Sequence, residues 1–336
     1  MNRRLILKTV LVTAAALAFG TAHAEDIKER TLKYALQNPK GHPLELGAQK
    51  FGEIVAARSG GKIKVKVFPG GALGGDQQIV SALQGGTVEM TGLNSGILAS
   101  QVKEFAIYDF PFLFANPQEA DAVVDGPFGT QMHARLADKG IVGLAYFELG
   151  FRDMTNSRRP IGTVGDIAGL KLRVIPNPIN IDWVNALGAN PVPLSWPEVY
   201  PALETHAIDG QENPVTVIQA NKINEVQKYL TLTHHVYNPQ SVIISKKVWD
   251  TFSADERKIV VEAAREAARY ERQVSRQQSE TALAELKKAG MQVAELPAAE
   301  MAKLREKMKP VIEKNTASVG AETVAALNTE LAKLRK

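Results

Sequence analysis

The chain of 336 residues contains no cysteine. Disulfide bonds, thiolate metal sites and cysteine nucleophiles are therefore excluded, and no processed N-terminal cysteine exists to carry a lipid. A chain of this length buries a core large enough to fold without covalent cross-links. The lack of cysteine is compatible with an exported protein.

The mature chain also has little net charge. The net charge of the whole chain is +4, and residues 1–24 hold three basic and no acidic residues, so the remainder carries +1. Such a nearly neutral body has no electrostatic footprint for nucleic acid. No run after the N-terminus is long and apolar enough to span a bilayer. Partners are therefore expected among small molecules and proteins.

Catalytic and cofactor motifs are missing as well. Residues 92–96 read G-x-N-S-G, with the serine displaced from a nucleophile elbow, and residues 59–62 lack the spacing of a phosphate loop. His234 and His235 are adjacent in a predicted strand, so their rings point to opposite faces and cannot chelate one ion together. We therefore expect no metal, no cofactor and no enzymatic activity.

The N-terminus has the features of a secretory signal. Basic residues 3, 4 and 8 precede an apolar stretch from Val10 to Phe19, which is too short for the ~20 residues of a membrane-spanning helix. The triplet at residues 22–24, Ala-His-Ala, is the small-x-small pattern that signal peptidase needs. We expect cleavage after Ala24 and a periplasmic mature protein; a retained N-terminal anchor is the alternative.

Strand and helix patterns alternate along the chain. Residues 32–36 and 63–67 are predicted strands, residues 44–57 a helix, and Asp76 the N-cap of a further helix. The second half repeats the order, with strands at 141–150 and 171–175 and a helix at 181–187. This order predicts an α/β fold with two lobes.

One helix is predicted to be unusually long. Ser253 and Glu256 form a capping box, and no proline or glycine follows until Gly290. At about 1.5 Å per residue the helix would span roughly 55 Å, more than the diameter of one domain. We therefore expect it to cross both lobes and to pack through an apolar stripe of Ala263, Ala267, Tyr270 and Val274.

The segment GLKLRVIPNP, residues 169–178, places an arginine in a strand. Lys171, Arg173 and Ile175 share one face, and the opposite face is apolar. Arg173 near the strand's end is either a surface arginine that reaches solvent along its apolar stem or a planar fork of donors that binds a carboxylate. The strand pattern alone leaves both open.

Several motifs carry a resemblance to a known family. They are the GLKLR strand, EVYPALE at 198–204, DGQENP at 209–214, EVQKYL at 225–230 and SKKVW at 245–249, which together cover most of residues 150–250. The chain resembles the periplasmic solute-binding proteins of TRAP transporters, the tripartite ATP-independent systems, of the C4-dicarboxylate-binding (DctP) type. The resemblance implies a two-lobed periplasmic-binding-protein-like fold with mixed sheets, a hinge and membrane permease subunits as partners.

The resemblance also implies lobe boundaries. Lobe I would comprise residues 25–150 and about 239–278, and lobe II about 151–238 and 279–336. The lobes would close on a small organic acid anion and deliver it to the small and large permease subunits. No feature indicates oligomerisation, so a monomer is expected.

Site residues follow from the resemblance. Arg173 takes the place of the arginine that clamps the ligand carboxylate, and a second arginine, an amide, an aromatic residue and first-lobe polar groups correspond to Arg152, Asn213, Trp196, Gln37 and Asn94. Asn177, two positions past the strand, is a further candidate. The alternatives are turn chemistry for Asn213, a core position for Trp196 and surface turns for Gln37 and Asn94.

The ligand stays open at this point. Two arginines suit a C4-dicarboxylate such as succinate or malate, and equally a sugar acid whose hydroxyls would meet the amides. A ligand-sensing protein that docks to a receptor is an alternative function, since the same fold reports occupancy either way. A periplasmic hydrolase is a further alternative, but no activated nucleophile and base stand in the sequence.

Overall fold

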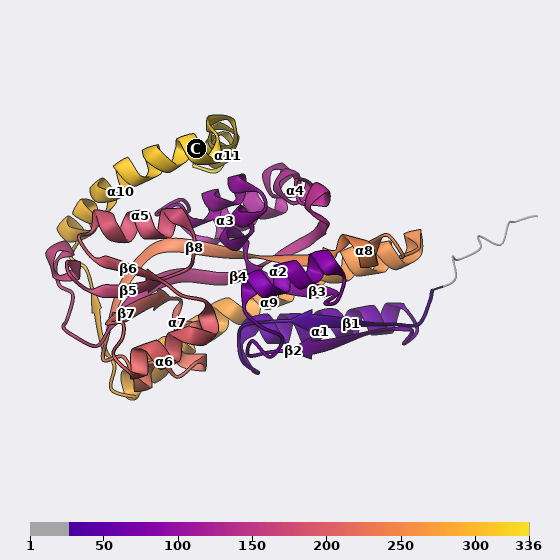
Figure 1. Ribbon diagram of the computed structural model, residues 1–336, viewed down its shortest axis with the longest axis horizontal. Coiled ribbons are helices and arrows are strands. Elements are labelled where there is room, and N and C mark those ends of the chain that lie inside the picture. Colours follow the sequence, from indigo (N-terminus) through magenta and orange to yellow (C-terminus); the bar gives the residue numbers. More distant parts are fainter. Residues whose placement is uncertain (1–26, 336) are drawn as a thin grey trace, which may run out of the picture.

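A computed structural model describes residues 27–335 of the chain (Figure 1). The predicted signal peptide and its cleavage site lie outside the described residues. Within them, one nine-stranded mixed sheet has the order β2-β1-β3-β8-β4-β7-β5-β6, and β9 pairs with β8 beside this path. The strands are β1 (Arg30–Ala35), β2 (Ile63–Phe68), β3 (Met90–Asn94), β4 (Ile141–Asn156), β5 (Lys171–Val174), β6 (Asn190–Pro193), β7 (Gly210–Asn213), β8 (Tyr229–Ser245) and β9 (Gln292–Glu295).

Helices cover the sheet on both sides. In Figure 1, α5 and α10 lie on one side of β5, β6 and β7, and α6 and α7 lie on the other. The helices are α1 (Pro43–Arg58), α2 (Asp76–Gly85), α3 (Pro117–Asp125), α4 (Pro127–Ala134), α5 (Pro178–Ala186), α6 (Val199–Glu204), α7 (Val215–Ala220), α8 (Lys246–Trp249), α9 (Ala254–Lys288), α10 (Ala298–Val319) and α11 (Ala321–Leu334). The predicted α/β class is confirmed.

Two long strands hold the halves of the molecule together. β4 and β8 pair antiparallel from Ile141 opposite Ser245 to Asn156 opposite Tyr229. The β1–β3 strands extend the sheet from β8, and β7, β5 and β6 extend it from β4. The predicted two-part architecture is thus built on one continuous sheet, because β4 and β8 belong to both parts.

The predicted long helix is confirmed as α9. The Ser253 hydroxyl accepts a hydrogen bond from the Glu256 N–H at 3.2 Å, and the Glu256 carboxylate accepts one from the Ser253 N–H at 2.8 Å. The helix contacts α1, β4 and α7, and therefore both ends of the sheet. Among the described residues, no helix combines the length and the apolar character needed to cross a membrane.

Two details of the helix predictions are wrong. Asp76 is the first residue inside α2, and the N-cap is Gly75, whose backbone is extended with φ −74° and ψ 165°. On α9, Tyr270 is 37% exposed, whereas Glu271 is fully buried. The buried stripe of α9 follows Ala263, Ala264, Ala267, Ala268 and Glu271, so its centre lies about a quarter of a helical turn away from Tyr270.

Glu271 lies where α9 packs on β4. One carboxylate oxygen accepts a hydrogen bond from the Glu148 N–H at 2.8 Å, and the other is buried without a hydrogen-bond partner in the described part of the chain. Burial raises the pKa of Glu271 well above its usual 4.5, and the nearby Glu148 carboxylate adds to the increase. The side chain therefore stays protonated in the folded protein at pH values where the unfolded chain ionises it.

This burial predicts a pH-dependent stability difference. The folded state retains a proton that the unfolded state loses, so the free energy of unfolding falls as pH rises above about 4.5. Glu271→Gln keeps the acceptor for the Glu148 N–H and removes the ionisation. We expect the variant to gain melting temperature relative to the native protein at pH 8, with a smaller difference at pH 4.5. A difference that does not change with pH would contradict the assignment.

Candidate functional site

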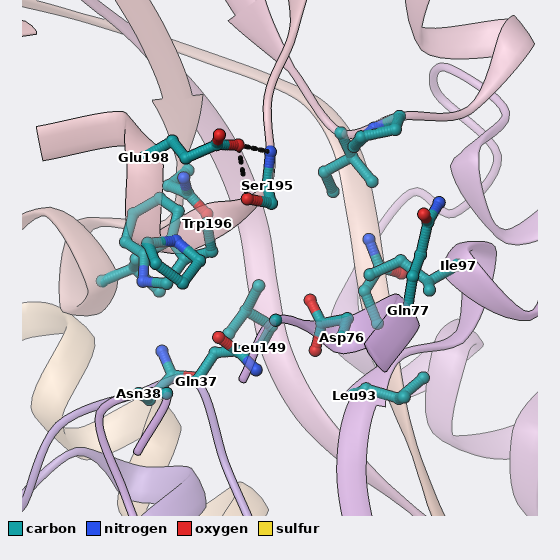
Figure 2. Close-up of a pocket in the computed structure, with 18 of the residues that line it drawn as sticks. Gln37, Asn38, Asp76, Gln77, Leu93, Ile97, Leu149, Ser195, Trp196 and Glu198 are labelled. Atoms are coloured by element: carbon teal, nitrogen blue, oxygen red, sulfur yellow. Dashed lines mark hydrogen bonds between the residues drawn. The ribbon is translucent and has the colours of Figure 1, made fainter. Parts of the chain in front are cut away.

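A cavity of about 490 Å³ lies between the two parts of the molecule, and residues from both line it (Figure 2). The β1–β3 side contributes the end of β1, the glycine-rich loop before α2, and the end of β3. The other side contributes β5, the segment from Ser195 to Glu198 and the end of β7. Of the predicted site residues, the structure places Arg173, Arg152, Asn213, Trp196, Asn94 and Gln37 on the lining.

Arg173 on β5 is buried but has no ion-pair partner within residues 27–335. Its side chain is 3% exposed, and its Nε and Nη2 groups both donate to the Leu194 carbonyl, at 3.0 and 2.7 Å. The Nη1 group has no hydrogen bond to any described residue. Its guanidinium lies 5.5 Å from the centroid of the Trp196 ring, a cation–π distance. The Nη1 donors therefore remain for a molecule in the cavity.

The charge on Arg173 persists at neutral pH. Burial and the like charge of Arg152 lower the pKa of Arg173 to about 10, while the carboxylates of Glu212, Asp76 and Glu198 act in the opposite direction. A buried, unpaired cation costs free energy that an anion in the cavity would recover.

Arg152 on β4 is placed differently. Its Nε donates to Glu212 Oε2 at 2.5 Å, and its Nη2 donates to Glu212 Oε1 at 2.7 Å and to the Glu212 carbonyl. Its Nη1 donates to Asn238 at 2.9 Å, and His235 Nε2 lies 3.2 Å from the Glu212 carboxylate. Most of the donors of Arg152 are therefore occupied by the protein itself, although the residue lines the cavity.

The Arg152–Glu212 pair is strongly coupled. Burial alone would raise the pKa of Glu212, but Arg152 and the hydrogen bond with His235 outweigh it and lower this pKa to about 2. The carboxylate is therefore ionised at every pH at which the protein is expected to work.

The two adjacent histidines point in different directions, as predicted. His234 is exposed and pairs with Asp153 at 3.0 Å, whereas His235 is buried beside Glu212.

Three amides give the cavity polar groups of both kinds. Asn94 accepts a hydrogen bond from the Gly96 N–H at 3.0 Å, while its Nδ2 is buried without a partner in the described structure. Gln37 donates to the Gly74 carbonyl at 2.8 Å, and its Oε1 is likewise unpartnered. Asn213 donates to Gln211 at 2.6 Å. One donor and one acceptor of these lining residues are thus buried without a partner in the described structure.

Asn177 does not line the cavity. It is the N-cap residue of α5, 3% exposed, and its Nδ2 donates to the Gly96 carbonyl at 3.2 Å and to Asp109 at 2.9 Å. The buried Asp109 carboxylate also accepts from Asn180 and Asn238. Asn177, three residues past β5, therefore ties the start of α5 to Gly96 and Asp109, and a direct ligand contact by Asn177 is not supported by this placement.

Two loops that line the cavity from opposite parts of the molecule come close together. A Cβ atom built on Gly75 would lie 3.7 Å from the Ser195 Cβ and 4.0 Å from Pro197. A Cβ atom built on Gly71, at φ +70°, would lie 3.6 Å from Pro197. The Ser195 segment is held rigidly, because Glu198 accepts from both the N–H and the hydroxyl of Ser195 (Figure 2). Glycine at these positions lets the two loops approach each other.

Sequence reasoning missed several polar lining residues, among them Asp76, Gln240 and Asn38. Asp76 was expected only as a helix cap, and Gln240 on β8 and Asn38 after β1 carried no motif. The position of Asp76 directly after a glycine-rich loop was the available signal. Gln240 lies opposite Asn94 in the β3–β8 register, which only the strand pairing reveals.

Comparison with known proteins decides the family. The family model described as bacterial extracellular solute-binding protein, family 7 (DctP) matches residues 34–318. The chain belongs to the DctP family of TRAP solute-binding proteins. Members of this family are periplasmic solute-binding proteins and not enzymes. The predicted function class is therefore confirmed.

Individual members of the DctP family are similar over nearly the whole chain. A TRAP solute-binding protein from Ochrobactrum anthropi, with its C-terminus bound in the ligand-binding pocket, is 55% identical with a TM-score of 0.82, covering 92% of this chain and 97% of that one. The sugar acid binding protein DctPAm from Advenella mimigardefordensis, in complex with galactonate, is 42% identical with a TM-score of 0.90, covering 92% and 99%. The C4-dicarboxylate-binding periplasmic protein DctP of Rhodobacter capsulatus is 33% identical over 99% of each chain.

The buried ion pair predicts a specific stability loss. Glu212→Gln leaves the Arg152 cation unpaired in the interior, which typically costs about 3–5 kcal/mol. The pKa of Glu212 is lowered from 4.5 to about 2, so its contribution is present above pH 4.5 and is lost as pH falls toward 2. We expect urea unfolding to show a large deficit for Glu212→Gln at pH 7 that narrows at pH 3. The control Glu225→Gln removes an exposed carboxylate, and an equal loss in both variants would contradict the argument.

Proposed function

We propose that the protein captures a small carboxylate between its two parts by closing them around Arg173, and delivers it to the TRAP membrane permease. Arg173 lines the cavity, and within the described chain its buried guanidinium has no ion-pair partner and its Nη1 has no hydrogen bond. This observation supports the proposal most directly. Enclosure removes water, so the arginine–carboxylate attraction acts in a lower effective dielectric. The relatives' ligands, galactonate and C4-dicarboxylates, all carry such a group.

Closure requires a hinge, and the strand pairing supports one between β4 and β8. The register of the two strands shifts between Glu148 and Gly150 and again between Arg152 and Met154. Gly150, at φ +109°, adopts a backbone conformation that favours glycine. These irregularities coincide with the proposed lobe boundary, with residues 25–150 and about 239–278 in lobe I and about 151–238 and 279–336 in lobe II.

The roles of the lining residues follow from their geometry. Arg173 binds the carboxylate, Trp196 holds the guanidinium plane, and Arg152 fixes the adjacent wall through Glu212. Asn94, Gln37 and Asn213 meet the rest of the ligand. The mature protein, beginning after Ala24, would act as a monomer that presents the closed form to the small and large permease subunits.

Replacement of Arg173 is the direct test. Arg173→Ala leaves a bound carboxylate without its partner, and we expect affinity to fall by about 3–5 kcal/mol, or roughly 150-fold or more. Arg173→Lys keeps a positive charge but lacks the planar fork of donors, so its affinity should lie between that of the native protein and that of Arg173→Ala. Isothermal titration with a panel of C4-dicarboxylates, aldonates and hexuronates would measure this, with the exposed Arg158→Ala as control. Unchanged affinity in Arg173→Ala would refute the clamp.

The close approach of these two loops yields a second prediction, about closure. A leucine at position 75 would project into the space that the Ser195–Pro197 segment occupies, so Gly75→Leu should weaken ligand binding by about tenfold or more. In Gly75→Ala the added Cβ makes only ordinary van der Waals contacts, and affinity should stay close to native. Stopped-flow dissociation would show the loss as faster release. Equal affinities in the two variants would mean that these loops do not meet in the bound form.

A further inference from the structure

Four charged residues line the cavity, but the protein itself occupies two of them. Arg152 is paired with Glu212, and Glu198 is exposed and accepts two hydrogen bonds from Ser195. Arg173 and Asp76 remain. The groups left for a ligand are therefore one cation and one anion.

Asp76 faces the cavity from the first turn of α2. The residue is half-buried, and its carboxylate points into the space that the labelled side chains surround in Figure 2. Neither oxygen has a hydrogen-bond or ion-pair partner among residues 27–335. Burial raises the pKa of Asp76 to about 6, and the attraction of Arg173 only partly offsets this increase. At neutral pH most molecules therefore carry an ionised acceptor there.

The chemistry of an ionised carboxylate restricts the ligand. A carboxylate only accepts hydrogen bonds, so a hydroxyl or ammonium group satisfies it, whereas a second carboxylate meets a like charge in a low-dielectric space. The unpartnered Nδ2 of Asn94 is a donor and the unpartnered Oε1 of Gln37 an acceptor. Hydroxyls both donate and accept, so several hydroxyls match this mixed set better than one further charge does.

We propose that Asp76 determines specificity, accepting a hydrogen bond from a ligand hydroxyl, so that the ligand is a polyhydroxylated monocarboxylate rather than a dicarboxylate. This inference rests on the proposed function, because the ligand carboxylate must first occupy Arg173. The carboxylate and the hydroxylated carbon chain then lie toward opposite walls of one cavity. Asp76 excludes a second carboxylate through charge repulsion and not through steric hindrance.

The test is a matched titration of the mature protein at pH 7.5. The ligands are galactonate and galacturonate as hydroxylated monocarboxylates, succinate and malate as dicarboxylates, and glutamate as an ammonium-bearing acid. We expect the native protein to bind a hydroxylated monocarboxylate more tightly than succinate by at least about tenfold, and Asp76→Asn to reduce that ratio by about tenfold to a hundredfold. Glu225→Gln, which alters an exposed acidic residue outside the cavity lining, should leave the ratio unchanged.

Each outcome has one meaning. Succinate or glutamate as the tightest ligand of the native protein, or equal weakening of both acid classes in Asp76→Asn, would overturn the role of Asp76 while Arg173 keeps its role. Absence of binding by every acid, or full binding by Arg173→Ala, would instead overturn the proposed function. Retained or improved succinate binding by Asp76→Asn also shows that the variant is folded.

Discussion

The pairing of β4 with β8 is the constraint on which the rest of the structure depends. Both strands are long enough to pass through the two parts of the molecule. Leu149 and Arg152 on β4 and Gln240 on β8 line the cavity. Because β3 pairs with β8 and β7 with β4, the ends of β3 and β7 reach the middle of the two long strands. The cavity forms there, between elements that are distant in sequence.

Burying two arginines beside one cavity costs free energy, because two like charges are removed from water. The structure treats the two residues differently. Arg152 is neutralised by Glu212 and becomes part of the wall. Within residues 27–335, the guanidinium of Arg173 contacts only the Leu194 carbonyl and the face of Trp196, which orient it without neutralising its charge. A fixed, uncompensated donor set is preorganised for an anion, since little rearrangement is needed when the anion arrives.

Much of this could be predicted from the sequence. Alternating patterns and the capping box gave most strands and the long helix, because local periodicity and end signals depend on neighbouring residues. Arg173 and the lining amides came from a family resemblance. The partner of Arg152 could not be foreseen, because Glu212 reaches it only through the β4–β7 register.

Asp76 shows what a local sequence rule cannot predict about the site. A local rule gave it a role as helix cap, and the structure moves it one position into the helix and turns its carboxylate toward the cavity. Tyr270 failed for a related reason: the buried side of α9 is set by its contacts with α1 and β4, so alanines and Glu271 are buried while a large aromatic ring is exposed.

The most direct measurement of the central claim is a crystal structure of the mature protein with galactonate bound. The account predicts that the ligand carboxylate contacts Nη1 of Arg173, that the Arg152–Glu212 pair is intact, and that a hydroxyl lies against Asp76. A carboxylate bound to Arg152 with Glu212 displaced, or a ligand in the reverse orientation, would contradict it.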